Sequence, residues 1–332
     1  MVIPMELGAR SYDIVLQRGC LDEAGKLLNL NRKALIVTDS GVPSQYAARV
    51  ARQCTAPVIV TVPTGEGSKS FPVYQQLCEK MLEENFHRTD CVVAVGGGVV
   101  GDLAGFVAAS FMRGVDFYNI PTTVLSQVDS SIGGKVAINL KHVKNIIGAF
   151  WQPKKVLIDP DVLETLPPRQ IANGLAEAIK MACTSDAELF AFLESHPLYE
   201  NIDTVIEGSL RIKKSIVEQD ETESGLRKLL NFGHTIGHGI ESTGGLFHGE
   251  CVALGMLPMC SDAVRARLVP VLEKAGLPTQ TQRDREAVWR AMQHDKKFSG
   301  GAVDIVVVDT VGHGTLQRVT PEQLRQRLEQ AL

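Results

Sequence analysis

The chain has few cysteines, few aromatic residues and no long apolar run, and each shortage excludes a class of protein. Its seven cysteines, among 332 residues, include no C-x-x-C pair, so neither a disulfide-bonded secreted scaffold nor a cysteine-based zinc module is expected. No stretch approaches the roughly eighteen uninterrupted apolar residues of a membrane span. The first residues also lack the basic and apolar regions of an export signal. We therefore expect a cytoplasmic protein with reduced thiols and no membrane partner.

The charge balance argues against nucleic acid and anionic membranes as partners. Lysine and arginine number 34 and aspartate and glutamate 38, which gives a net charge of -4. Without an excess of positive charge, general binding to nucleic acid or to an anionic membrane is not expected. Any affinity for an anion must then come from a local cluster of basic side chains. The composition, 44% hydrophobic and 22% charged, is that of a globular protein, and the length allows two domains.

The first half of the chain alternates short β-branched runs with amphipathic segments. This pattern predicts a largely parallel sheet covered by helices, with its strands at Tyr12–Leu16, Ala34–Thr38, Val58–Val62, Cys91–Val95, Asp116–Ile120 and Val156–Ile158. The helices expected between them are Ser44–Arg52, Val73–Glu84 and Val100–Ala109. The loops that follow parallel strands meet at one edge of the sheet, so we expect a ligand to bind along that edge.

The second half is predicted to be helical. From about residue 161 the strand signals disappear, and helical periods cover Arg169–Thr184, Asp186–Glu194, Ile202–Glu218, Leu229–Ser242 and Glu250–Ala266. A late apolar run, Val303–Val308, is expected to form a hairpin with Thr315–Val319, before a terminal helix from Pro321. We therefore expect an α/β domain over residues 1–160 and an all-α domain over residues 161–332.

The sequence NFGHTIGHGIE carries a spacing that suits a metal ion. His234 and His238 are four residues apart and share a helix face with Glu241, while three glycines indicate that something approaches this backbone closely. His248 follows shortly afterwards, and Glu177 lies on an upstream helix. Carboxylate and imidazole together suit Zn²⁺ with an open coordination position. The same spacing also fits histidines that bind no ion.

The segment Gly96–Asp102 matches G-x-G-x-x-G after an apolar strand and at the start of a helix. Glycine lets the backbone approach a diphosphate, and the helix N-terminus supplies N–H donors. Such turns are common, and this one does not follow the first strand of the domain, so the motif alone leaves nucleotide binding open. Asp39 and the loop Thr64–Lys69 fit contacts to a ribose or ring, and fit helix caps equally well.

Two further groups of residues suit an anionic substrate. The stretch 121–150 is rich in glycine and hydroxyl groups and poorly amphipathic, so we expect it to line a polar cavity. Its basic and amide side chains, with one arginine upstream, would bind a phosphate: Arg113, Lys135, Lys144 and Asn145. Intervals of three and four predict one helical face for Glu223, Arg227, Asn231 and His234. Arg227 with Lys213 suits a carboxylate, and a solvated charged stripe is the alternative.

Taken in order, the segments Gly96–Asp102, Pro121–Lys135, Gly174–Lys180 and Leu226–Glu241, with His248-Gly249-Glu250, resemble the 3-dehydroquinate synthase family. The resemblance spans nearly the whole chain. It implies an α/β N-terminal nucleotide-binding domain with a largely parallel sheet, an all-α C-terminal metal-binding domain, and a homodimer. It also implies NAD⁺ and a divalent cation, zinc or cobalt.

The implied enzyme is a phosphate-eliminating lyase of the shikimate (chorismate) pathway to the aromatic amino acids. It converts 3-deoxy-D-arabino-heptulosonate 7-phosphate into 3-dehydroquinate and phosphate. The implied steps are a transient oxidation by NAD⁺, elimination of phosphate, re-reduction and an intramolecular aldol closure. The cofactor is therefore regenerated in each turnover.

The resemblance also assigns residues. It moves the metal ligands to Glu177, His234 and His248, which leaves His238 either to support a ligand or to lie beside the substrate. The implied NAD⁺ contacts are Asp39, Glu66, Lys69, Gly97, Gly98, Val99, Asp102, Thr122, Thr123, Lys135, Lys144 and Thr165. The implied catalytic and substrate contacts are Asp129, Lys135, Asn145, Lys180, Lys213, Arg227, Asn231, His238 and Lys297, with Arg113 reaching a neighbouring subunit's site.

Three other hypotheses about function compete with the one that the resemblance implies. Another sugar phosphate cyclase, making an inosose or a valiolone, would act on a substrate without the carboxylate and would have less need of Arg227 and Lys213. A metal-dependent polyol dehydrogenase would release NADH and would not need a phosphate-binding set. A catalytically silent NAD-binding protein is disfavoured by the intact Glu177, His234 and His248.

Overall fold

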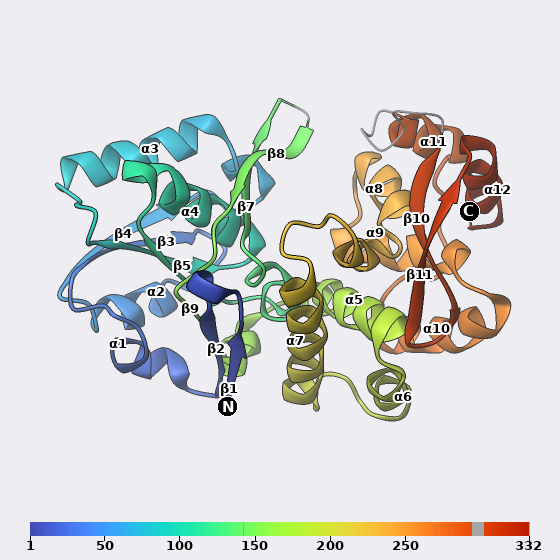
Figure 1. Ribbon diagram of the computed structural model, residues 1–332, viewed down its shortest axis with the longest axis horizontal. Coiled ribbons are helices and arrows are strands. Elements are labelled where there is room, and N and C mark those ends of the chain that lie inside the picture. Colours follow the sequence, from blue (N-terminus) through green and yellow to red (C-terminus); the bar gives the residue numbers. More distant parts are fainter. Residues whose placement is uncertain (142, 294–301, 332) are drawn as a thin grey trace. The chain divides into compact units, whose positions relative to one another are not determined.

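The computed structural model describes residues 1–141, 143–293 and 302–331. Lys297, predicted as a substrate contact, lies outside these residues. The chain divides into two compact units, Met1–Leu166 and Pro167–Leu332 (Figure 1). Within the described residues, no helix combines the length and the hydropathy of a transmembrane segment.

A seven-stranded sheet forms the centre of the first unit (Figure 1). Its strands, in spatial order, are β1 (Val2–Met5), β2 (Tyr12–Leu16), β9 (Lys155–Ile158), β6 (Asp116–Pro121), β5 (Cys91–Gly96), β3 (Lys33–Asp39) and β4 (Ala56–Val62). Every neighbouring pair is parallel except β1 with β2. The predicted parallel sheet is confirmed. The antiparallel strand β1 was not predicted, because it is short and contains a proline, as edge strands often do.

Helices cover both faces of this sheet, which is why its central strands read as continuous apolar runs. On one face, α1 (Ala24–Leu27) and α2 (Ser44–Ala51) pack with alternate strand residues such as Ile36. On the other, α3 (Phe71–Glu83) and α4 (Gly98–Ser110) pack with the intervening ones, such as Leu35. The sheet therefore lies between two hydrophobic cores, one on each face.

The polar stretch after β6 folds differently from the helices around it. A π-helical turn at Ser126–Ser130 is followed by a hairpin of β7 (Lys135–Leu140) and β8 (Val143–Phe150). The hairpin docks on α4 at a glycine, since a Cβ on Gly105 would lie 2.3 Å from Val136 Cγ1. β8 is largely exposed and has no buried face, so its sequence gives no strand alternation.

Helices form most of the second unit: α5 (Pro168–Ser185), α6 (Ala187–Ser195), α7 (Ile202–Gln219), α8 (His234–Ser242), α9 (His248–Met256), α10 (Asp262–Lys274), α11 (Arg285–Gln293) and α12 (Pro321–Ala331). A hairpin, β10 (Val303–Thr310) with β11 (His313–Val319), accompanies them.

Two predicted helices were wrong in their extent. The segment Leu229–Ser242 is broken: a 3-10 helix, Leu226–Asn231, ends before Gly233, and α8 begins only at His234. Gly233 has φ +77°, a left-handed conformation that favours glycine and interrupts the helix. The segment predicted as Glu250–Ala266 is likewise two helices, α9 and α10, separated by a 3-10 turn that contains Pro258.

Candidate functional site

Three potential metal ligands converge in the second unit. Glu177 comes from α5, while His234 and His248 are the first residues of α8 and α9. Glu177 Oε1 lies 3.8 Å from His234 Nε2 and 3.6 Å from His248 Nε2. These separations are too long for hydrogen bonds. They are close to the roughly 3.4 Å between two ligands of one tetrahedral zinc ion with bonds near 2.0–2.1 Å.

Glycines bring the three helices together. A Cβ on Gly249 would lie 2.0 Å from the Asn173 carbonyl oxygen of α5, and one on Gly237 would lie 3.0 Å from the Cys251 carbonyl oxygen of α9. At Gly237, one of the three glycines that indicated a close approach, the approach is thus helix on helix. Asn173 Oδ1 also accepts a 2.6 Å hydrogen bond from the Gly249 N–H, which fixes the start of α9 and with it His248.

Glu177 is fully buried, yet it remains ionised. Burial alone would raise its pKa, but the Lys180 ammonium and His248 together hold the pKa well below its usual range. Lys180 Nζ donates to Glu177 Oε2, whereas Glu177 Oε1 has no hydrogen-bond partner among the described residues. A buried, ionised oxygen that faces two imidazole nitrogens is a donor set that fits a divalent cation.

The two histidines are held with their Nε2 atoms toward this oxygen. His234 Nδ1 lies 3.1 Å from the Phe232 carbonyl oxygen, so Nδ1 carries the proton and Nε2 keeps its lone pair. Burial, with Lys180, keeps the pKa of His234 well below its usual value. For His248, burial is outweighed by Glu177 and Glu241, which raise its pKa to about 9. A bound cation would therefore displace a proton from His248.

A second group of potential ligands overlaps the first. His238, Glu241 and His248 also offer ligand atoms within 4.8 Å of one another. It contains His238 and Glu241, which helical spacing alone favours together with His234, and adds His248 from α9. His248 Nδ1 is 3.2 Å from Glu241 Oε2, so its ring lies between the two carboxylates of Glu241 and Glu177. Full burial and an oxygen without a hydrogen bond favour the set that contains Glu177.

The predicted helical face of Glu223, Arg227, Asn231 and His234 was wrong. Glu223 lies in a loop with φ +63°, Arg227 and Asn231 lie on the 3-10 helix, and His234 begins the next helix. Even so, Asn231 Nδ2 donates to Glu223 Oε1 at 2.7 Å. Arg227 and Lys213 are both buried, so two cationic groups lie in the interior of this unit.

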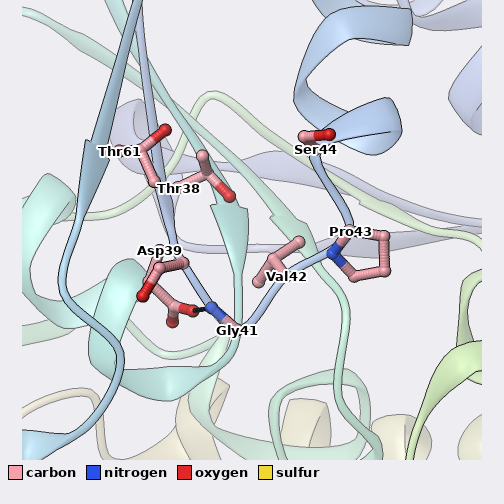
Figure 2. A pocket seen from close by; sticks show the side chains of 8 residues that line it. Thr38, Asp39, Gly41, Val42, Pro43, Ser44 and Thr61 are labelled. Atoms are coloured by element: carbon pink, nitrogen blue, oxygen red, sulfur yellow. Dashed lines mark hydrogen bonds between the residues drawn. The ribbon is translucent and has the colours of Figure 1, made fainter.

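In the first unit, a pocket lies where β3 ends (Figure 2). Asp39 Oδ1 accepts a 2.7 Å hydrogen bond from the Gly41 N–H, and Thr38 Oγ1 is buried without a partner among the described residues. Ser40 Oγ accepts from the Thr64 N–H, so the two predicted loops adjoin. The pocket is lined by Thr38, Asp39, Ser40, Gly41, Val42, Pro43, Ser44 and Thr61.

A polar network gathers four of the predicted residues. Buried Lys69 places Nζ 2.6 Å from Asp102 Oδ2 and 3.5 Å from Glu66 Oε1, and also donates to Asn145 Oδ1. Asn139, which was not predicted as a site residue, joins them. Its Nδ2 donates to Glu66 Oε1 at 2.9 Å and its Oδ1 accepts from the Asn145 N–H at 2.8 Å. Its position in the polar stretch 121–150 was the available signal.

The glycine-rich turn opens α4 at Gly98, with Gly97 as its N-cap. A Cβ on Gly97 would lie 3.0 Å from Thr123 Cγ2, and one on Gly98 would lie 3.0 Å from Ser130 Oγ, itself buried without a partner in the described chain. Among the described residues, no side chain caps this N-terminus. The backbone donors and the surrounding hydroxyls fit an anionic diphosphate.

The remaining predicted residues of the first unit have varied settings. Thr165 Oγ1 lies 3.0 Å from the Tyr46 hydroxyl, and Asp129 lies on the π-helical turn. Arg113 has φ +67°, in a turn directly after α4. The other members are Val99, in the first turn of α4, Thr122, at the end of β6, and the exposed Lys135 and Lys144, on the hairpin.

A parallel α/β unit and a helical unit that carries a carboxylate–imidazole cluster make this chain similar in architecture to solved sugar phosphate cyclases. The 2-epi-5-epi-valiolone synthase ValA from Streptomyces hygroscopicus, solved with NAD⁺ and Zn²⁺ bound, is 27% identical with a TM-score of 0.88, over 98% of this chain and 97% of that one. A 2-deoxy-scyllo-inosose synthase shares the fold, with a TM-score of 0.92, 24% identity and full coverage of both chains.

Sequence comparisons are more specific. The 3-dehydroquinate synthase N-terminal model matches residues 59–173, and the C-terminal model matches residues 174–298. A curated 3-dehydroquinate synthase from Enterococcus faecalis is 41% identical, over 98% of each chain. The chain belongs to the 3-dehydroquinate synthase family.

Removal of the buried carboxylate tests the metal site. We expect Glu177→Gln to lower zinc affinity by more than the roughly 10- to 100-fold that loss of a supporting residue costs, because the ion loses its only anionic ligand in this set. Zinc content after dialysis against a weak chelator, measured by plasma mass spectrometry, reads this out. The matched control is Glu194→Gln on α6, where the carboxylate pairs with Arg267 of α10. This variant should keep full zinc content. Full zinc content in Glu177→Gln would exclude this ligand set.

Proposed function

We propose that this protein is a 3-dehydroquinate synthase, which converts 3-deoxy-D-arabino-heptulosonate 7-phosphate into 3-dehydroquinate and phosphate in the shikimate pathway. The observation that carries the proposal is the ionised, buried Glu177 facing His234 and His248, in a chain 41% identical to a curated enzyme of that name. Buried Arg227 and Lys213 in the same unit suit the substrate's carboxylate.

When bound, NAD⁺ and a divalent cation supply reversible hydride acceptance and polarisation of the hydroxyl that is oxidised. The residues proposed to hold the cation are Glu177, His234 and His248. Those proposed to hold the dinucleotide include Asp39, as an acceptor for ribose hydroxyls, and the backbone N–H groups at Gly97 and Gly98, as donors to the diphosphate.

The substrate contacts divide by chemistry. We propose that Arg227 and Lys213 bind the carboxylate and that Lys135, Asn145 and Arg113 bind the phosphate. Asp129, Lys180, Asn231 and His238 are proposed to orient the hydroxyls around the reacting carbons, which fixes geometry before the reaction. Lys180 has a second role, because its ammonium keeps Glu177 ionised.

The pairing of Lys69 with Asp102 gives the proposed cofactor side a fixed shape. Both residues are implied NAD⁺ contacts, and Lys69 is buried with its ammonium held by carboxylate and amide oxygens. A buried charge that is already paired does not rearrange when a ligand enters, which favours a preorganised site. The homodimer, the cytoplasmic location and the domain boundary at residue 160 stay predictions.

The reaction's redox balance tests this function. With the purified protein, the heptulosonate phosphate, Zn²⁺ and a catalytic amount of NAD⁺, we expect phosphate release far in excess of NAD⁺, no net NADH, and one 3-dehydroquinate per phosphate. Phosphate by a colorimetric assay, NADH by absorbance and product by mass spectrometry give the three values. Accumulating NADH would indicate a polyol dehydrogenase instead. No turnover here, with turnover of a sugar phosphate that lacks the carboxylate, would indicate a cyclase of the inosose or valiolone type.

Arg227 tests the carboxylate assignment. We expect Arg227→Ala to raise KM for the heptulosonate phosphate by roughly 10- to 150-fold, because it removes a charge-assisted contact worth about 1.5–3 kcal/mol. The Kd for NAD⁺, from fluorescence titration, should change less than about 3-fold by the same reasoning. Arg211→Ala, at an exposed arginine on α7 that pairs with Glu207, is the control and should change neither value. Equal losses in both constants would count against the carboxylate role.

A further inference from the structure

One carboxylate organises the loop between α7 and the 3-10 helix that carries Arg227. Asp220 Oδ1 accepts from the Ser224 N–H at 2.8 Å and from the Ser224 hydroxyl at 3.0 Å. Asp220 Oδ2 accepts from the Gly225 N–H at 2.7 Å and from the Arg227 N–H at 3.0 Å. Asp220 is itself buried, so these four donors and the carboxylate satisfy one another away from water.

The loop that Asp220 holds has an unfavourable backbone. Glu223 has φ +63°, which costs a non-glycine residue on the order of 1 kcal/mol. Such a shape persists only where surrounding contacts determine it. The contacts that determine it here run to Asp220 from Ser224, Gly225 and Arg227.

The same loop sets two proposed substrate contacts. Arg227 Nη1 donates to the Glu221 carbonyl oxygen, and Glu223 Oε1 accepts from Asn231 Nδ2. Arg227 is thus held at both ends. The Glu221 carbonyl oxygen holds its guanidinium, and Asp220 holds its backbone N–H. A change in the loop would move Arg227 and Asn231 together.

We propose that Asp220 is a positioning residue for substrate binding, which holds the loop 220–225 in the shape that presents Arg227 and Asn231. The proposal rests on the proposed function, since that function makes Arg227 a substrate contact. Burial would raise the pKa of Asp220, but hydrogen bonds from Gly225, Arg227 and Ser224 keep the pKa well below its usual range. The carboxylate therefore stays an acceptor throughout the neutral pH range.

A double-mutant cycle distinguishes this role from a merely structural one. Asp220→Asn leaves one oxygen and one NH₂ group, so either Ser224 or the Gly225 and Arg227 pair loses its acceptor. We expect KM for the heptulosonate phosphate to rise roughly 10- to 100-fold, with kcat changed less than about 3-fold. In an Arg227→Ala background, the same substitution should raise KM by a clearly smaller factor, because only its effect through Asn231 remains. Zinc content and the Kd for NAD⁺ should not change.

Two further variants keep the test decisive. Ser224→Ala removes one donor and is milder, so it should raise KM in the same direction by a smaller factor, and again by less when Arg227 is absent. Glu218→Gln, in the last turn of α7 at a residue paired with Lys214, is the control and should leave KM unchanged. An equal rise in KM with and without Arg227, or no rise in either loop variant, would overturn the proposal.

Chemical modification separates this proposal from the proposed function. Phenylglyoxal should modify buried Arg227 slowly in the unaltered protein and at least about 5-fold faster in Asp220→Asn, because release of the loop exposes the guanidinium. Peptide mapping by mass spectrometry measures this rate without turnover, with exposed Arg211 as the internal reference. If the unaltered protein releases no phosphate but Arg227 responds, the function fails and the positioning role stands. If Arg227 reacts at the same rate in both proteins, the positioning role fails.

Discussion

The buried carboxylate of Glu177 constrains how three helices of the second unit, α5, α8 and α9, pack together. Glu177 is fully buried and charged, a state that is strongly unfavourable unless opposite charges and hydrogen-bond donors surround it. Lys180 supplies one such partner from the same helix, and His234 and His248 supply the facing nitrogens from α8 and α9. Those two helices reach Glu177 only because glycines let their backbones approach closely, as Gly249 does against α5. The glycines that allow close helix packing are therefore also required for the electrostatic contacts that stabilise Glu177.

Buried charged groups with satisfied hydrogen bonds also occur away from the metal cluster. Lys69 in the first unit is buried against Asp102, and Asp220 in the second unit is buried against four donors of its own loop. Each arrangement fixes a polar group before any ligand arrives. Preorganised charges of this kind lower the cost of binding and orienting a charged substrate. The proposed chemistry needs such order, because its successive steps act on one bound molecule.

The parts of the fold that were predictable are those whose side chains repeat with a clear period. Strands such as β3 and β5 are buried on both faces and are read directly as apolar runs, and α5 and α7 show strong helical periods. The break at Gly233 was not predictable, because the period of apolar residues continues across it while the backbone does not. The hairpin of β7 and β8 was missed because β8 is largely exposed and β7 buries three consecutive residues, so neither strand shows an alternation.

The site was predictable in its residue types but not in its pairing. Helical spacing indicated His234 with His238, whereas the choice of His248 and Glu177 depends on how α5 and α9 pack, which no local pattern encodes. Asn139, although it lies in the polar stretch 121–150, was given no role, and Asp220 was not predicted, because both act on backbone N–H groups that only the folded loops bring near them. Resemblance to a family supplied the ligand assignment that spacing alone left open.

Anomalous diffraction at the zinc edge, from crystals of the zinc-loaded protein, tests the central claim most directly because it locates the ion itself. We expect one strong peak within bonding distance of Glu177 Oε1, His234 Nε2 and His248 Nε2. A peak bound instead by His238 and Glu241, or no peak near Glu177, would contradict it.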